Sequence, residues 1–250
     1  MTTTRTIRAL AILFALACAS AANAQPTAGG SQSSMPLGGK LTVGVNVGAQ
    51  TRSSTVSSDF TFPIYGQTAA VTTSASVDGG PLFDLSASYR FIPSIGIGIG
   101  YSTFRNTGTA QGAATIPSPV FFNQFAQVTI DATAAKHTEN NVYVVIAGFV
   151  PITNAIELSL FVGPSFTSVK QDVLSNVTVP VGTQSVVATT QTESGTAKGV
   201  NVGADVAYQF TRLVGAGAFI RYNGGSVDLT TLQDVKAGGF QIGIGARLRF

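Results

Sequence analysis

The sequence has 250 residues and a formal net charge of +3, and it is apolar with few charges: 44% of its residues are hydrophobic and 10% are charged. So small a charge excess does not give the basic surface that nucleic acids bind, so we expect no nucleic-acid partner. The chain has one cysteine, Cys18, and one histidine, and neither a disulfide framework nor a cluster of metal ligands can be built from them. We therefore expect no cofactor and no metal site.

Residues 1–24 have the pattern of a cleavable signal peptide. Two arginines precede a short apolar run, and Ala22-Asn23-Ala24 supplies the small residues of a signal-peptidase site. The run is too short to span a membrane as a helix. A lipoprotein with Cys18 at its new N-terminus is disfavoured by Ala15, where a bulky aliphatic residue is expected. Residues 25–36, rich in Gly, Ser and Pro, are predicted to form a flexible periplasmic linker, and residues 37–250 a single domain.

This domain is predicted to be all β. In the stretch 240–250, apolar residues alternate with Gly, Gln and Arg, so one face of a strand is wholly apolar and the other carries Arg247 and Arg249. A lipid-facing surface must be apolar whereas a barrel lumen can hold charges, so the pattern is typical of a transmembrane barrel strand. An apolar chain that has no segment of about 20 apolar residues can still cross a membrane as a closed barrel. The alternative is a secreted, soluble β-sandwich.

Similar alternation recurs along the rest of the domain. Six more segments show it, and a seventh is apolar on both faces. The six are 40–50, 83–91, 95–102, 156–163, 200–210 and 214–222, and the seventh is 141–149. With short turns after Phe91, Phe149 and Phe210 and long connections at the other end, these segments predict an eight-stranded antiparallel up-and-down transmembrane β-barrel.

Together these features resemble the small eight-stranded outer-membrane barrels of Gram-negative-type bacteria, of the OmpA-transmembrane, OmpX and opacity-protein type. The resemblance implies a location in the cell outer membrane, contact with outer-membrane lipid, and biogenesis by the barrel-assembly machinery. In that family the last strand resembles the signal that this machinery reads. The matching positions here are Phe240, Ile242, Ile244, Leu248 and Phe250. Because the chain lacks Trp, its tyrosines (Tyr89, Tyr101, Tyr143, Tyr208 and Tyr222) and phenylalanines are expected to form the aromatic girdles.

Charged residues at inward strand positions are expected to lie inside the barrel. They are Lys40, Asp84, Arg90, Glu157, Asp205, Arg221, Arg247 and Arg249. Unpaired charges would be costly there, so we expect ion pairs such as Glu157 with Arg247 or Arg249. Inward glycines, among them Gly100 and Gly243, are expected to leave room for water. Two interpretations stay open: ion pairs that fill a closed lumen, and an ion path through a charged constriction.

The long connections are candidates for specific function. They are 53–79, 106–140, 169–198 and 224–236, and their Thr, Ser and Val alternation predicts that the strands continue beyond the membrane. Aromatic groups in two of them are candidate contacts for an extracellular surface ligand. The candidates are Phe60, Phe62, Tyr65, Phe121, Phe122 and Phe125. In the alternative, these side chains pack on one another or fold down as a plug.

We expect an integral outer-membrane barrel without enzymatic activity, serving envelope structure or surface contact through its long loops. The alternative from another class is a narrow, porin-like barrel for small ions or hydrophobic solutes. An outer-membrane lipid hydrolase would need an imidazole base near the membrane surface. His137, closely followed by Glu139, is the candidate base, and Asp131 is available elsewhere, but beside Lys136 we expect His137 to be a solvated loop residue.

Overall fold

The computed structural model describes residues 39–51, 54–178, 187–229 and 235–250, so the predicted signal peptide and linker lie outside the described residues. Within these ranges the chain forms a single antiparallel sheet of ten strands. The strands are β1 (Leu41–Thr51), β2 (Ser54–Ile64), β3 (Gln67–Val77), β4 (Gly80–Ile92), β5 (Ile95–Pro117), β6 (Phe125–Pro151), β7 (Ile156–Thr178), β8 (Val187–Gln209), β9 (Val214–Val227) and β10 (Val235–Arg249). No helix in this part of the chain is long and apolar enough to cross a membrane.

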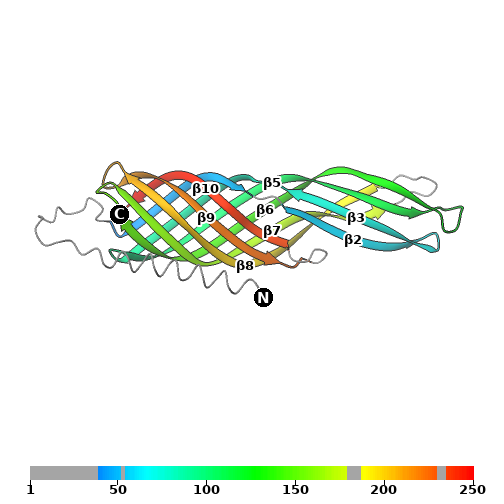
Figure 1. Cartoon of the computed structure of the whole chain (residues 1–250), viewed down its shortest axis with the longest axis horizontal. Coiled ribbons are helices and arrows are strands. Elements are labelled where there is room, and N and C mark those ends of the chain that lie inside the picture. The colour runs from blue at the N-terminus through cyan, green and yellow to red at the C-terminus, as the bar shows by residue number, and fades with distance from the viewer. Residues whose placement is uncertain (1–38, 52–53, 179–186, 230–234) are drawn as a thin grey trace, which may run out of the picture.

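Eight of the strands close into a ring, which confirms the predicted eight-stranded barrel. Going around it, the order is β1, β4, β5, β6, β7, β8, β9 and β10, and β10 pairs back with β1 over ten residue pairs. Closure leaves the ring without an unpaired edge. Figure 1 shows a long cylinder in which the C-terminus lies at the end that carries the short β4–β5, β6–β7 and β8–β9 turns.

The side chains of the ring alternate between a lipid-type exterior and a filled interior. On β5, Ile97, Ile99 and Tyr101 are exposed, whereas the intervening Gly98 and Gly100 face inward and are buried. On β10 the exposed face carries four of the five residues expected to form the assembly signal, and the fifth, Leu248, is half-buried. The four are Phe240, Ile242, Ile244 and Phe250. Large apolar side chains on the outside of a closed barrel are stable only when lipid surrounds them.

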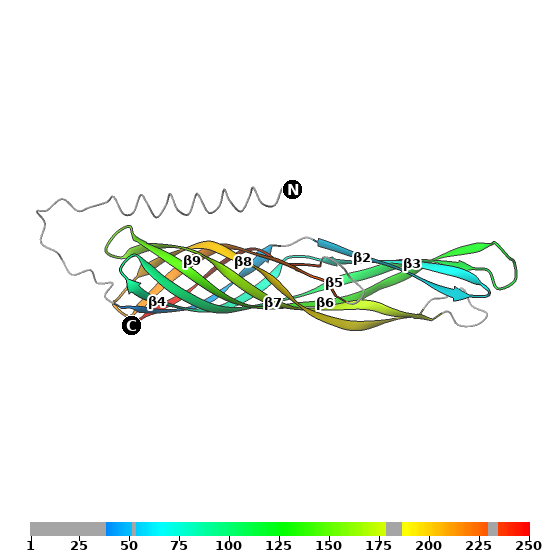
Figure 2. The same ribbon diagram turned by 90° about the horizontal axis from the view of Figure 1, so that it is seen from below.

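Four strands are far longer than a membrane requires. A tilted spanning strand needs about 9–11 residues, but β5, β7 and β8 have 23 residues each and β6 has 27. Their distal halves, with the β2–β3 hairpin, extend well beyond the ring (Figure 2). The hairpin joins this extension because β3 pairs with β5 between Ala70 and Ala75. The predicted continuation of the strands is therefore confirmed.

The extension has its own apolar core. It consists of Val71, Ala110, Ala114, Ile116, Ile130 and Ala135, with Phe60, Phe62, Ala75 and Val128 packed against it. These side chains come from β2, β3, β5 and β6, so the core fixes the hairpin against the long strands. Burial of apolar area is the main favourable term in folding a water-exposed sheet of this kind.

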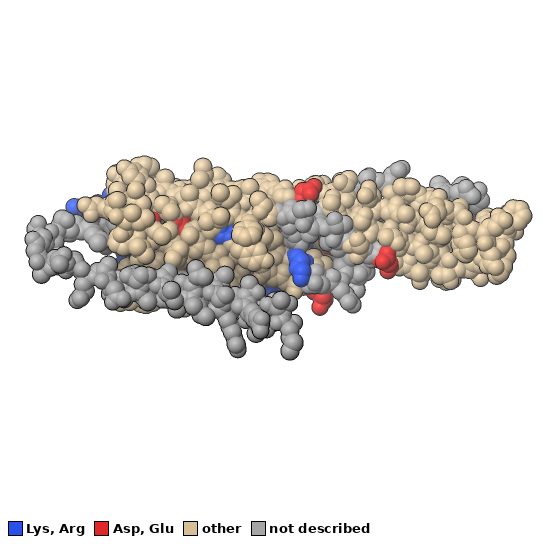
Figure 3. All heavy atoms as spheres, in the orientation of Figure 1, with Lys and Arg blue, Asp and Glu red and all other residues tan. Residues whose placement is uncertain are grey.

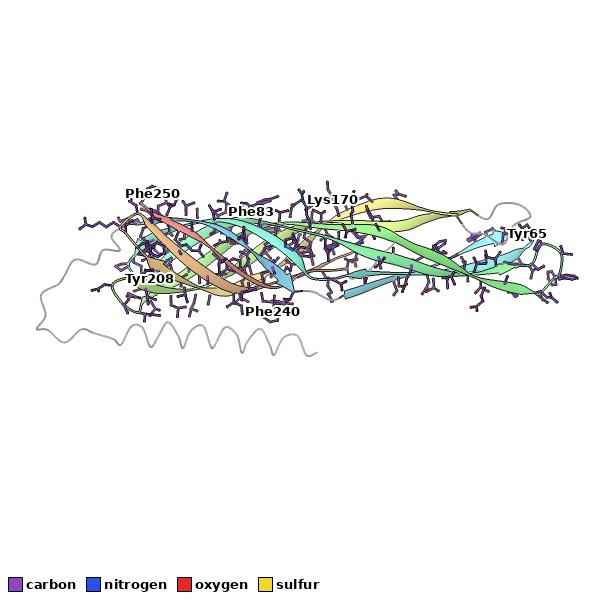
Figure 4. All side chains as sticks on the ribbon, turned by 90° about the horizontal axis from the view of Figure 1, so that it is seen from above. Tyr65, Phe83, Lys170, Tyr208, Phe240 and Phe250 are labelled. Atoms are coloured by element: carbon purple, nitrogen blue, oxygen red, sulfur yellow. The ribbon has the colours of Figure 1, made fainter. Side chains whose placement is uncertain are left out.

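Exposed aromatic side chains mark both ends of the apolar exterior. Tyr208 and Phe250 lie near the short-turn end, and Phe83 and Phe240 lie further along the cylinder (Figure 4). The expectation that tyrosines would form the girdles is wrong for Tyr143. Its side chain is buried in the lumen, because the odd-numbered residues of β6 within the ring point inward.

Candidate functional site

Two regions of the molecule concentrate polar or exposed side chains: the lumen of the ring and the distal tip of the extension. Near the short turns, Glu157 on β7 is buried and receives two guanidinium groups. Arg90 Nη1 donates to one carboxylate oxygen at 2.7 Å, and Arg249 Nη2 donates to the other at 2.8 Å. The Arg90 guanidinium also lies 4.0 Å from the centre of the Phe149 ring. Glu157 thus pairs with Arg249, one of the two partners expected from the sequence.

In the middle of the lumen, Asp84 on β4 is an acceptor shared by three side chains. Its two oxygens accept hydrogen bonds from Asn46 Nδ2 at 2.8 Å, from the Tyr143 hydroxyl at 2.9 Å and from Arg221 Nη1 at 2.8 Å. Arg247 donates to Asp205 on β8 and to the amide oxygen of Asn46. The Asp84 carboxylate therefore compensates the buried charge of Arg221 directly and contacts Arg247 through Asn46.

Toward the extension, the network continues through amide side chains. Arg221 donates to Gln241, and Gln241 donates to Gln50. Gln50 Nε2 donates to Glu139 at 2.9 Å, and the same carboxylate contacts His137 Nε2 at 2.9 Å. His137 Nδ1 then lies 2.6 Å from Gln171 Oε1. The result is an unbroken sequence of side-chain hydrogen bonds along the lumen, from Asp205 to Gln171.

His137 is consequently not the solvated loop residue expected from the sequence. It is only 1% exposed, lies within β6, and stacks edge-on against Phe104 at a ring distance of 6.0 Å. β6 was expected to begin near residue 141, whereas it begins at Phe125, and its odd-numbered side chains from Ala135 to Phe149 point inward. Glu139 and His137 are therefore lumen residues that the sequence analysis missed. Both would have been found by extending the alternation of residues 141–149 toward lower residue numbers, with odd-numbered side chains pointing inward.

Aromatic rings occupy much of the space that the inward glycines leave. A Cβ atom on Gly100 would lie 2.2 Å from the ring of Tyr143, its cross-strand partner, and one on Gly243 would lie 2.5 Å from the ring of Phe219. The expectation that these glycines make room for water is wrong at both positions. A cavity of about 90 Å³ remains among Asp84, the arginines and the other lumen side chains, which is room for a few water molecules.

Seven of the eight predicted interior charges line the lumen. They are Asp84, Arg90, Glu157, Asp205, Arg221, Arg247 and Arg249. Lys40 departs from the prediction, because it precedes β1 at the end of the ring and is exposed to solvent. Among the described residues, no three His, Cys, Asp or Glu side chains gather as metal ligands.

The distal tip is the turn between β5 and β6. Phe121 is 60% exposed, Phe122 76% and Phe125 52%. Ser118 stabilises the turn, since its hydroxyl accepts from the backbone N–H groups of Val120 and Phe121 at 3.3 and 3.2 Å. The tip of the β2–β3 hairpin lies beside it (Figure 4 labels Tyr65 there), and Asn123 N donates to Gln67 Oε1 at 3.1 Å.

The two aromatic groups named as candidate contacts thus behave differently. Phe60 and Phe62 are half-buried, 6.5 Å apart, and pack on the core of the extension. The phenylalanines of the β5–β6 turn stay exposed. No charged residue occurs between Asn106 and Ile130, and on the face shown in Figure 3 the described residues of the distal end carry no Lys, Arg, Asp or Glu.

Comparison with known proteins identifies the family. Residues 14–247 match the model of the outer membrane protein beta-barrel domain. The chain belongs to this family. It is thus an outer-membrane β-barrel protein, and in such barrels the short turns face the periplasm and the long strands or loops face outward. The extension of this family member is accordingly extracellular. No curated protein matches the sequence.

Several solved structures are similar in fold. The outer membrane protein OprG from Pseudomonas aeruginosa is 10% identical with a TM-score of 0.48, and the match covers 85% of this chain and 96% of that one. Neisserial surface protein A is 15% identical with a TM-score of 0.45, and the match covers 84% of this chain and 97% of that one. The outer membrane protease OmpT from Escherichia coli is 12% identical with a TM-score of 0.44, and the match covers 84% of this chain and 97% of that one.

Proposed function

We propose that this outer-membrane barrel is a non-enzymatic surface-contact protein, in which a filled barrel anchors a rigid extension that presents an aromatic tip. The observation that carries the proposal is the length of the β5–β6 hairpin together with its exposed end. The hairpin's strands are about twice as long as a membrane requires. They end in Phe121 and Phe122, which face solvent on the extracellular side.

The construction of the extension supports a contact role. A flexible loop would lose conformational entropy on binding. This tip is instead held in place by strand pairing, by an apolar core and by the Asn123–Gln67 hydrogen bond. Large aromatic side chains on a preordered surface are the residues that most often carry binding energy at interfaces. Exposing them to water has a cost, and a partner that covers them would remove it.

The test is adherence of cells that display the chain to an epithelial monolayer and to octyl-coated beads. We expect the triple variant Phe121→Ser/Phe122→Ser/Phe125→Ser to lose roughly ten-fold or more in adherence. The matched control is Gln124→Ser/Gln127→Ser, which alters polar side chains of the same turn and should adhere normally. A heat-dependent gel shift verifies the folded barrel in each case. Unchanged adherence of the triple variant would contradict the proposal.

Transport through the lumen is the competing function, and the charge pairing argues against it. An ion path needs mobile water along the barrel axis, whereas here each of the four lumen guanidinium groups is hydrogen-bonded to a carboxylate. We expect planar-bilayer recordings of the refolded chain to show no unitary conductance steps. Steps whose ion selectivity changes in an Arg247→Glu variant would establish the transport function instead.

A hydrolase role for His137 is also disfavoured. A general base must reach a proton of the substrate, and this imidazole is enclosed by Glu139, Gln171 and Phe104 inside the barrel. We expect an assay of lipid hydrolysis to give the same rate for the wild-type chain and for a His137→Ala variant. A loss of hydrolysis in that variant would overturn the non-enzymatic assignment.

A further inference from the structure

The distal tip ends in four exposed apolar side chains that follow one another around the β5–β6 turn. Val120 is 77% exposed and Phe122 is 76% exposed, and Phe121 and Phe125 are also more than half exposed. No charged residue occurs at 60–77 or at 106–130, the segments that contain the ends of the β2–β3 and β5–β6 hairpins. The tip therefore offers a partner apolar contact without ion pairs.

Four backbone N–H groups of this turn donate to acceptors inside the protein. Those of Val120 and Phe121 donate to the Ser118 hydroxyl at 3.3 and 3.2 Å. The N–H of Ser118 donates to the Gln124 carbonyl at 2.7 Å, and the N–H of Asn123 donates across to the β2–β3 hairpin at 3.1 Å. Two further residues of the turn are prolines, which have no N–H. The backbone of the turn thus needs few hydrogen bonds from water.

This internal pairing favours a lipid partner over a protein partner. A protein can supply acceptors to backbone donors that a loop leaves unpaired, whereas the interior of a bilayer supplies none. The strongest contacts of protein interfaces also lie at the centre of a broader surface that excludes water. Here the exposed phenylalanines lie instead on a turn at the far end of the extension (Figure 2). Both features suit a segment that leaves water for lipid.

The position of the tip selects a second membrane over the membrane that holds the ring. From Arg105, just beyond the outward apolar residues of the ring, to Pro117, β5 advances about 40 Å along its own direction. In Figure 2 the extension continues away from the ring, along the length of the cylinder. Strand pairing and the extension core hold the tip in this position, so it does not reach back to the bilayer around the ring.

We propose that the aromatic tip inserts into the surface of a second phospholipid membrane, that of a cell in contact with this one. The proposal rests on the surface-contact function and names its partner. Interfacial insertion buries apolar side chains by about 5–10 Å at the boundary between headgroups and acyl chains. Along the two hairpins the nearest charged residues are Asp59 and Asp131, each about 20 Å along its strand from the turn. Insertion to this depth therefore brings no charge into lipid.

Because the chain has no Trp, one introduced Trp reports on its own surroundings. The tip reporter is Phe122→Trp, and the control reporter is Thr109→Trp, at an exposed position of β5 within the extension. Each protein is refolded into phosphatidylcholine nanodiscs and mixed with vesicles of dibrominated phosphatidylcholine. We expect the vesicles to quench the tip reporter by about half or more and to leave the control reporter unquenched. Because the tip carries no charge, the quenching should be the same at low and high salt.

Two variants of the tip reporter separate apolar insertion from a general effect of the turn. Phe121→Ser/Phe125→Ser should weaken vesicle binding roughly ten-fold, because binding to a membrane surface scales with the apolar area that is buried. Gln124→Ser/Gln127→Ser, which alters polar side chains of the same turn, should leave it unchanged. A heat-dependent gel shift confirms the fold of each variant. No quenching of the tip reporter, or quenching only by anionic vesicles at low salt, would overturn the proposal.

Adherence of cells that display the chain separates this proposal from the contact function itself. If the triple phenylalanine variant loses adherence but vesicles do not quench the tip reporter, the contact function stands and the lipid assignment is wrong. Association of the nanodiscs with one another, without quenching by vesicles, would assign the tip to a second copy of the chain instead. If neither adherence nor quenching depends on the phenylalanines, both proposals fail.

Discussion

The membrane ring and the extracellular extension are built from the same strands with opposite polarity. Along β5, the outward residues change from Ile97, Ile99 and Tyr101 to Arg105 and Thr107 without any break in alternation. The inward residues change in the other direction, from glycine and serine to alanine and isoleucine. The apolar face is thus outside in one region and inside in the other.

This inversion shows that the surrounding solvent determines which face of a strand is apolar. In lipid, apolar side chains gain nothing from an inward position, so the interior is free to hold ion pairs. In water the interior must bury apolar area to stabilise the sheet. The point of inversion lies near Phe104, which is buried with Leu82 and Phe219. The polar network passes this level and ends at His137 and Gln171.

Deleting a buried carboxylate is expected to have the largest effect on the ring. In Asp84→Ala, Arg221 loses the carboxylate with which it pairs at 2.8 Å and stays in the lumen, and Asn46 and Tyr143 lose an acceptor. We expect the free energy of unfolding to fall by about 3–5 kcal/mol, measured by urea unfolding in vesicles. A fall below about 1 kcal/mol would show that the lumen charges are not structurally coupled.

Deleting an apolar side chain inside the extension should have a smaller and local effect. Ile116→Ala removes a 95% buried side chain from the extension core and should cost about 2–5 kcal/mol of local stability. Limited proteolysis should then cut the extension faster, while the heat-dependent gel shift of the ring stays unchanged. Thr109→Ala, on the exposed face of the same strand, is the control. Simultaneous loss of the gel shift would mean that the two regions unfold as one unit.

Filling the space beside a lumen ring should have the smallest of the three effects. A Cβ on Gly100 overlaps the Tyr143 ring, so Gly100→Ala should cost about 1–3 kcal/mol and weaken the Tyr143–Asp84 hydrogen bond. Urea unfolding measures the cost. Gly148→Ala on β6 is the comparison, since the nearest atoms to its Cβ are 3.9 Å away. An equal loss of stability at both positions would contradict the packing of the Tyr143 ring against Gly100.

The inward and outward faces of single strands could be predicted from the sequence, because apolar and polar residues alternate within each strand. The ring, its eight strands and seven of the eight interior charges followed from that alternation. What could not be predicted depends on cross-strand partners. Residues 141–149 are apolar on both faces, and only the pairing of Tyr143 with Gly100 shows why an apolar inward face fits there.

The ends of the long strands were harder for a related reason. Beyond the membrane, polar and apolar residues alternate with the opposite sense, so the connection that holds His137 resembled a solvated loop. Its burial depends on Glu139 from the same strand and Gln171 from the next one. Likewise, Phe60 and Phe62 could not be distinguished from the exposed phenylalanines of the tip, because the core that covers them is assembled from β3, β5 and β6.

The inversion is tested most directly by placing one arginine on the outward face of β5 in each region. Ile97 is exposed in the middle of the membrane segment, and Thr109 is exposed in the extension. We expect Ile97→Arg to lower the free energy of unfolding in vesicles by about 2–4 kcal/mol, and Thr109→Arg to change it by less than about 0.5 kcal/mol. Equal effects at the two positions would contradict a membrane ring that continues into a water-exposed extension.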